Sequence, residues 1–100
     1  MYERIMAIYV KNQEEYQRYR EAMTPILRSI GGKFGYDLSV DKVIKSKCQN
    51  PINRIFTIEF PSKAVMQTFF NREDYCAIRD EHLAHSVSHF TVISMHEKTE

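Results

Sequence analysis

The order of the hydrophobic patterns is the feature that most constrains how this 100-residue chain can fold. Four short segments are apolar throughout or alternate apolar and polar residues, as β-strands do. Two longer segments repeat apolar residues every three to four positions, as helices do. The strand patterns cover 5–10, 33–40, 54–60 and 89–95, and the helical patterns cover 13–30 and 63–78. The predicted order is therefore strand, helix, strand, strand, helix, strand.

This order predicts an α+β fold of the ferredoxin-like βαββαβ type, in which an antiparallel four-stranded sheet carries both helices on one face. The length fits one domain over residues 1–100. Hydrophobic residues make up 43% of the chain, which is typical of a folded globular protein.

The first helix has recognisable signals at both ends. Asn12 followed by Glu15 predicts a capping box, in which the Asn12 side chain accepts the Glu15 backbone N–H and the Glu15 side chain accepts the Asn12 backbone N–H. Gly31 and Gly32 predict the end of the helix. Pro25 lies inside, and we expect it to kink the helix rather than end it, because the apolar stripe continues in phase.

The second face of the predicted sheet has no helix to cover it. Six side chains are expected there: Ile5, Ala7, Tyr9, Ile55, Thr57 and Glu59. An open apolar patch of this size is unusual on a soluble monomer. We therefore expect a homodimer in which a second sheet covers this face.

The low net charge and the short apolar segments argue against nucleic acid and membranes as partners. A net charge of +1 supplies no field for nucleic acid or for an anionic membrane. Apolar runs of a few residues are far shorter than the roughly 20 that span a bilayer. We expect a cytoplasmic protein that binds neither nucleic acid nor membrane, with Cys48 and Cys76 as free thiols.

Several short motifs occur in a characteristic order. They are Tyr-x-x-Tyr at Tyr16 and Tyr19, Pro25, Gly-Gly-x-Phe ending at Phe34, Glu-Phe-Pro-Ser from Glu59 to Ser62, and Tyr-x-x-x-Arg at Tyr75 and Arg79. With these motifs the chain resembles, over about residues 5–95, the bacterial family called domain of unknown function 1330, in the dimeric α+β barrel superfamily. The resemblance implies the ferredoxin-like fold and a homodimer. It implies little about chemistry, because proteins of this fold include monooxygenases, haem-dependent enzymes, isomerases and ligand-binding proteins.

Glu59 is the first candidate catalytic residue. Strand alternation points it away from the helices, together with Tyr9, toward the space between two sheets of a dimer. Burial there would raise the pKa of the carboxyl group, which could then act as a general acid or base. The alternative is that Glu59 pairs with an Arg or Lys at the rim of the barrel.

Tyr75, Arg79 and His82 are spaced by four and three residues, so they share one helix face. We expect them to form a wall of the same pocket, with Arg79 holding an anionic group of the substrate. Equally, Arg79 could pair with Asp80, Glu81 or Glu59.

His82, His85 and His89 would share a face, and could bind a metal ion or haem, if the helix continued to residue 89. The last strand is predicted to begin near His89, which takes the third histidine out of register. We therefore predict no metal site and no cofactor.

Two functions remain open. The first is a cofactor-independent small-molecule enzyme, of isomerase or monooxygenase type, with a pocket between helices and sheet. In it Glu59 or His82 transfers the proton, and Tyr9, Tyr75 and Arg79 bind substrate. The alternative is a non-catalytic module that binds a small ligand. A wholly apolar cavity favours the binding module, whereas convergence of Glu59 and a histidine favours the enzyme.

Overall fold

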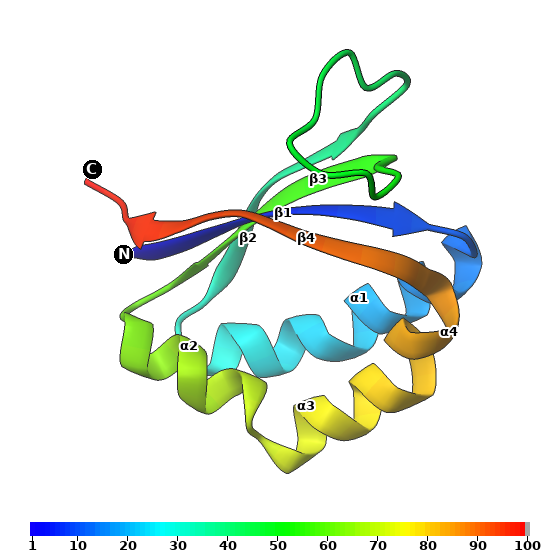
Figure 1. Cartoon of the computed structure of the whole chain (residues 1–100). Helices are drawn as coiled ribbons and strands as arrows, with labels where there is room; N and C mark the ends of the chain where they lie inside the picture. Colours follow the sequence, from blue (N-terminus) through cyan, green and yellow to red (C-terminus); the bar gives the residue numbers. More distant parts are fainter. Residues whose placement is uncertain (100) are drawn as a thin grey trace.

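The structure is a computed structural model that describes residues 1–99. Its elements are β1 (Tyr2–Val10), α1 (Gln13–Ser29), β2 (Lys33–Ser39), β3 (Arg54–Phe60), α2 (Lys63–Phe70), α3 (Glu73–Ile78), the π-helical turn η1 (Arg79–Leu83), α4 (Ala84–Ser86) and β4 (Val87–Glu97). The strands form an antiparallel sheet in the order β2-β3-β1-β4. The helices lie together on one face of this sheet (Figure 1). The predicted ferredoxin-like α+β fold is confirmed.

Helix α1 begins and ends where its sequence signals predict. The Asn12 side chain accepts a hydrogen bond from the Glu15 backbone N–H at 3.0 Å. The reciprocal half of the capping box is absent from the described residues, because the Asn12 N–H donates to the Ser86 carbonyl at 3.2 Å and the Glu15 carboxylate bonds Arg18 and His82. The helix continues through Pro25 to Ser29. Gly31 then adopts a φ of 82°, a left-handed conformation that glycine takes without strain.

The chain between α3 and β4 differs from the prediction at its boundaries. The last helical turns form η1, whose hydrogen bonds span five residues, and then the short α4. Strand β4 begins at Val87, two residues before the predicted His89, because Val87 pairs with Val10 at the end of β1.

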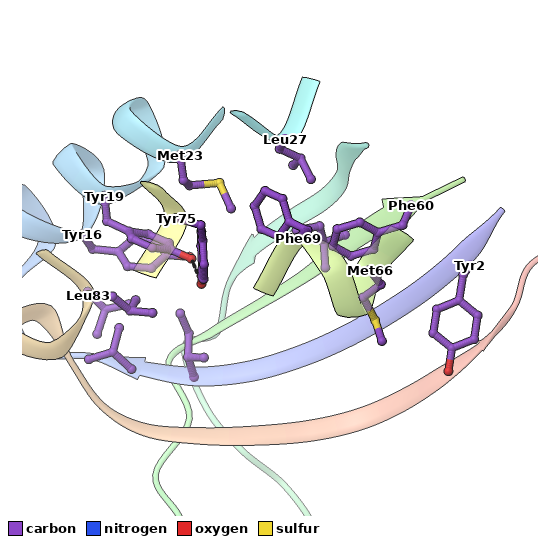
Figure 2. Close-up of a cluster of buried hydrophobic side chains, with 14 residues drawn as sticks. Tyr2, Tyr16, Tyr19, Met23, Leu27, Phe60, Met66, Phe69, Tyr75 and Leu83 are labelled. Atoms are coloured by element: carbon purple, nitrogen blue, oxygen red, sulfur yellow. Dashed lines mark hydrogen bonds between the residues drawn. The ribbon is translucent and has the colours of Figure 1, made fainter. Parts of the chain in front are cut away.

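The hydrophobic core fills the space between α1, α2 and the sheet (Figure 2). Its largest fully buried apolar side chains are Tyr16, Phe60, Phe69, Ile8, Met23 and Leu27. The apolar positions of α1 face the sheet, as the helical spacing predicts. Even-numbered residues of β1 and β3 point toward the helices and supply the other side of the core.

The face of the sheet opposite the helices is less open than predicted. Ala7, Thr57 and Glu59 are buried there, and Tyr9 is 37% exposed. The loop between β2 and β3 lies on this side of the sheet (Figure 1). Its Cys48 and Asn50 side chains both contact the hydroxyl of Thr91, which is the ladder neighbour of Ala7. The expectation of an uncovered apolar face was wrong to this extent, because the chain covers part of the face itself.

Two smaller features concern the cysteines and the membrane. Cys48 and Cys76 are both unpaired, as predicted. Within residues 1–99, no helix has the length and apolar character needed to cross a membrane.

Candidate functional site

A cavity of about 210 Å³ lies between the helices and the covered face of the sheet. We call it the helix–sheet cavity. Its aromatic lining residues are Tyr16, Tyr19, Phe34, Phe56, Phe70, Tyr75 and Phe90, and its other lining residues are Arg4, Met6, Ile8, Met23, Ile58, Arg79 and Leu83. Among the described residues, the charged groups that line it are the two arginines.

The sequence periodicities explain why these residues meet. Met6 and Ile8 alternate along β1, and Phe56 and Ile58 alternate along β3, so that both pairs point toward the helices. In the ladder Met6 lies opposite Phe56. The floor of the cavity is therefore the inner face of the two central strands.

A pair of tyrosine hydroxyl groups forms the polar centre of the helical wall. The hydroxyl oxygens of Tyr19, from α1, and Tyr75, from α3, lie 2.8 Å apart (Figure 2). Burial raises the pKa of Tyr75 and raises that of Tyr19 further, to well above the ordinary value. Both hydroxyl groups therefore stay protonated at neutral pH. Two hydroxyl groups carry two protons, and their mutual hydrogen bond uses one of them.

Arg4, near the start of strand β1, brings a positive charge into the lining of the cavity. It shares the parity of Met6 and Ile8, so its side chain lies on the inner face. Its Nε is buried and has no hydrogen-bond partner within residues 1–99. The guanidinium carbon lies 5.0 Å from the centre of the Phe70 ring. Burial lowers the pKa of Arg4, while the nearby tyrosines Tyr75 and Tyr19 oppose that shift.

Arg79 lies at the start of η1, and its side chain is 45% exposed. Its Nε donates to the Asp80 carboxylate at 3.1 Å. This is one of the pairings that the sequence left open. The exposure of Arg79, together with that of Phe90 at 49%, places both residues where the cavity meets solvent.

Glu59 is on the opposite face of the sheet. Its carboxylate accepts a hydrogen bond from Lys98 at 2.8 Å and lies 3.8 Å from the Lys33 ammonium nitrogen. The bond from Lys98 is the main reason that the pKa of Glu59 is lowered. The expected rise in this pKa was wrong, because neighbouring ammonium groups outweigh desolvation. The alternative of an ion pair with lysine is confirmed.

Tyr9 and His82 are also outside the lining of the helix–sheet cavity. Tyr9 lies on the outer face beside His89 of β4. His82 is in η1, and its Nδ1 lies 2.5 Å from the Glu15 carboxylate of α1. The expectation that all five candidate residues surround one pocket was wrong, because the helices cover the face of the sheet opposite Glu59 and Tyr9. Tyr75 and Arg79 do meet at the cavity.

The three histidines considered as metal ligands occupy three different elements. His82 lies in η1, His85 in α4 and His89 in β4. The described part of the chain holds no group of three His, Cys, Asp or Glu residues placed to share a metal ion.

Arg4 and Tyr19 are polar lining residues that the sequence analysis did not select. Arg4 has a signal in the sequence, because a charged residue at the parity of Met6 and Ile8 interrupts an otherwise apolar strand face. Tyr19 belongs to the Tyr-x-x-Tyr motif of the first helix, and its hydroxyl partner lies 56 residues away. Spacing within one helix carries no information about such a partner.

Solved structures show the same fold at low sequence identity. A protein of unknown function from Rhodopseudomonas palustris, RPA0582, is 15% identical with a TM-score of 0.80, covering 99% of this chain and 82% of that chain. A Dabb family protein with a ferredoxin-like fold from Mesorhizobium loti is 19% identical with a TM-score of 0.66, and the match covers 99% of this chain and 97% of that chain. The Arabidopsis thaliana protein At3g17210 is 15% identical with a TM-score of 0.67, and the match covers 100% of this chain and 97% of that chain.

Sequence comparison gives a family and no characterised relative. Among curated proteins, none is detectably similar to this chain. The family described as domain of unknown function (DUF1330) matches residues 4–96, which include every residue of the helix–sheet cavity. The fold, the order of motifs and this match agree, and the chain belongs to the DUF1330 family.

Proposed function

We propose that this protein binds a small molecule in the helix–sheet cavity. The observation that carries the proposal is a cavity of about 210 Å³, open to solvent beside Arg79 and Phe90, in a 100-residue molecule. Protein interiors are normally close-packed, with few voids larger than a water molecule. An engineered apolar cavity of about 150 Å³ is large enough to bind benzene. A compound with one or two rings therefore matches the size of the space.

The lining has the composition of a ligand site. Aromatic and aliphatic side chains form most of the wall, and the polar groups are Arg4, Arg79, the Tyr19–Tyr75 pair and the Tyr16 hydroxyl, which accepts a hydrogen bond from Arg20. A largely apolar pocket with a few placed polar groups is the usual design of small-molecule sites. The apolar wall supplies affinity, and the polar groups set the orientation of the ligand.

Binding without proton transfer is the function that this lining favours. Among the described residues that line the cavity, none is an Asp, Glu, His or Cys. Tyr19 and Tyr75 are held in the protonated form, because burial raises the pKa of each. Arginine stays charged at neutral pH. The lining therefore offers hydrogen-bond donors and positive charge, but no group able to accept a proton as a general base.

A cofactor-independent enzyme is the second candidate, and one observation favours it. The Tyr19–Tyr75 pair and Arg79 are donors in a partly desolvated site, where such groups stabilise a developing oxyanion. In this version Tyr75 and Arg79 hold the substrate. The base would come from the substrate or from solvent, since Glu59 and His82 lie outside the lining.

We also propose that the protein is a homodimer, but with β4 contacting the second copy rather than a second sheet covering the outer face, which the loop between β2 and β3 already partly covers. This strand is 11 residues long and forms an edge of the sheet. Its Val92, Ile93 and Met95 side chains are 44%, 53% and 48% exposed. A long apolar edge strand is prone to association unless a partner covers it. Because Phe90 on the same strand lines the cavity, a partner there would narrow the opening.

Light scattering on two matched variants tests the dimer. We expect the wild type to elute at twice the chain mass and Ile93→Lys to elute as a monomer. Ile44→Lys is the control, because Ile44 is 93% exposed in the loop between β2 and β3. It should remain dimeric. A monomeric wild type at micromolar concentration would contradict the proposal.

Ligand-observed NMR with a panel of one-ring and two-ring compounds tests the binding site. We expect several compounds to bind the wild type and to lose binding in Leu83→Phe, whose larger side chain enters the cavity. Leu38→Phe makes the same change at an exposed position of β2 and should bind as the wild type does. Thermal melts establish that both variants are folded. No binding to wild type, or equal binding to Leu83→Phe, would rule out this site.

A further inference from the structure

Resting on the proposed function, we infer that the ligand is an organic monoanion, namely a carboxylate on an apolar body of one or two rings, and that Arg4 binds the carboxylate. The proposal names the chemical class of the ligand. It depends on three features of the helix–sheet cavity: an uncompensated cation, neutral hydroxyl donors, and aromatic walls.

The first feature is the state of the Arg4 side chain. Its Nε is buried without a hydrogen-bond partner in the described chain. None of the ion pairs formed by residues 1–99 includes Arg4. Arg4 is only partly buried, but the Nε–H has lost water without gaining an acceptor, which is unfavourable for a donor on a charged group. An anion in the cavity would satisfy this donor.

Comparison with two other partly buried arginines makes this state informative. Arg20 and Arg54 both pair with the Asp37 carboxylate, at 3.4 Å and 2.6 Å. Arg54 does so through two parallel hydrogen bonds. The fold therefore supplies a carboxylate to these two arginines, which stack on the Phe34 and Tyr16 rings of the cavity lining. It supplies none, within the described residues, to the arginine in the cavity.

The orientation of Arg4 leaves its donors free for a ligand. The guanidinium carbon lies 5.0 Å from the centre of the Phe70 ring, a cation–π distance. The ring holds the charge by electrostatic attraction and accepts no hydrogen bond in the plane of the guanidinium. A carboxylate pairs with arginine in that plane, through two parallel N–H···O bonds. Phe70 can thus hold Arg4 in place while the binding edge stays open.

The neighbouring donors fit a single negative charge. The Tyr19–Tyr75 pair keeps one proton to donate beyond itself. Burial raises the pKa of both tyrosines, so neither becomes an anion that would repel the ligand. The charge of Arg79 is already partly offset by Asp80. One uncompensated cation therefore matches one carboxylate better than a dianion such as a phosphate monoester.

The walls around these donors fit an apolar, flat body. Phe34 and Phe56 stand edge to face with ring centres 5.8 Å apart, and Met6 and Met23 line the same space. Thioether side chains adapt to the edges of aromatic ligands. Carboxylate and apolar body would therefore bind in one defined orientation.

Calorimetric titration with two matched probes, sodium 2-naphthoate and neutral 2-naphthamide, tests the proposal at pH 7.5. We expect the wild type to bind naphthoate at least tenfold more tightly than the amide. In Arg4→Met this preference should fall to within twofold, through loss of naphthoate affinity alone. Arg28→Met removes an exposed arginine of α1 and should keep the full preference. Arg4→Gln serves as a second variant if Arg4→Met does not fold.

The outcomes separate this proposal from the proposed function. Equal affinity of the wild type for the two probes would overturn the anion assignment and leave the cavity as a binding site for neutral compounds. A tenfold preference that persists in the Arg4 variants would overturn the role of Arg4. If neither probe binds the wild type while the panel of ring compounds does, the ligand class is wrong. If nothing binds, the binding function itself fails.

Discussion

At the scale of single residues, Arg4 and Glu59 are charged side chains on neighbouring central strands, and they differ in whether an opposite charge lies nearby. The Glu59 side chain is 6% exposed and has two lysines beside it. Arg4 faces the other side of the sheet, where its neighbour is the aromatic ring of Phe70 instead of an opposite charge. We therefore expect Glu59 to stabilise the fold and the unpaired charge of Arg4 to reduce the stability of the ligand-free protein.

Replacing Arg4 tests whether its unpaired charge reduces the stability of the ligand-free protein. We expect Arg4→Met to raise the free energy of unfolding by about 1 kcal/mol, because an apolar side chain of similar length removes an unpaired, partly buried charge. Urea unfolding of the ligand-free protein measures the change. Arg28→Met should stay within about 0.5 kcal/mol of wild type, as surface substitutions do. A clear loss of stability in Arg4→Met would mean that Arg4 has a structural partner.

Glu59→Gln should lower the free energy of unfolding at pH 7 by about 1 kcal/mol, because it removes a hydrogen-bonded ion pair whose lysines are partly exposed. The pKa of Glu59 is lowered in the folded protein, mainly by Lys98. The stabilisation is therefore fully present above the unfolded pKa of about 4.3 and is lost as the pH falls through the folded pKa.

Thermal melts of wild type and Glu59→Gln between pH 2.5 and 8 measure this dependence. The two curves should differ at neutral pH and converge in acid. Glu97→Gln, at an exposed position of β4, should follow the wild type throughout. A difference that grows as the pH falls has the wrong sign for this ion pair.

At the scale of elements, the start of α1 and the turn η1 are joined through one carboxylate. Asn12 caps the helix by accepting the Glu15 N–H, and the Glu15 carboxylate bonds His82 of η1. Turn η1 also carries Arg79 and Leu83 into the lining of the cavity. The beginning of α1 therefore helps to fix the position of the helical wall.

Asn12→Ala should destabilise the protein by about 1 kcal/mol, the usual effect of losing an N-cap. Asn12→Ser should recover most of this stability, because serine is also a good N-cap residue. Urea unfolding of the three proteins gives the comparison. An unchanged Asn12→Ala, or a serine variant no better than alanine, would show that the cap does not stabilise the helix.

Hydrophobic periodicity predicted most elements but not the hydrogen bonding of the last helical turns. Strand β3 matches its predicted range, and the buried positions of α1 match the predicted stripe. Periodicity reports which side chains face the core. It does not report whether a turn closes with four-residue or five-residue spacing, which the sequence pattern around Arg79 leaves undetermined. It also cannot show that Val87 pairs with Val10.

At the scale of the whole molecule, the sheet separates two groups of polar residues. Glu59 and its lysines lie on the outer face, and Arg4, Tyr75 and Arg79 lie on the face covered by helices. The sequence could predict this separation for strand residues, because alternation assigns each to a face. It could predict that Tyr75 and Arg79 lie together, because they are four residues apart on a helix.

The remaining features of the site depend on contacts distant in sequence. Lys98 reaches Glu59 across 39 residues, and Tyr19 reaches Tyr75 across 56. The loop between β2 and β3 folds over the outer face through contacts with Thr91. No local pattern specifies these pairings, so the ionisation state of Glu59 and the polar centre of the cavity required the three-dimensional structure.

The central claim, that the helix–sheet cavity holds a ligand, is tested most directly by NMR on methionine methyl groups labelled with ¹³C. Met6 and Met23 line the cavity, Met66 lies in the core outside the lining, and Met95 is 48% exposed on β4. Titration with 2-naphthoate and with the panel of ring compounds should shift the Met6 and Met23 signals in a saturable way and leave Met66 unchanged; Met95 lies opposite Arg4 in the ladder and is not the control. Saturable shifts confined to Met95 or Met66, or none at all, would contradict the claim.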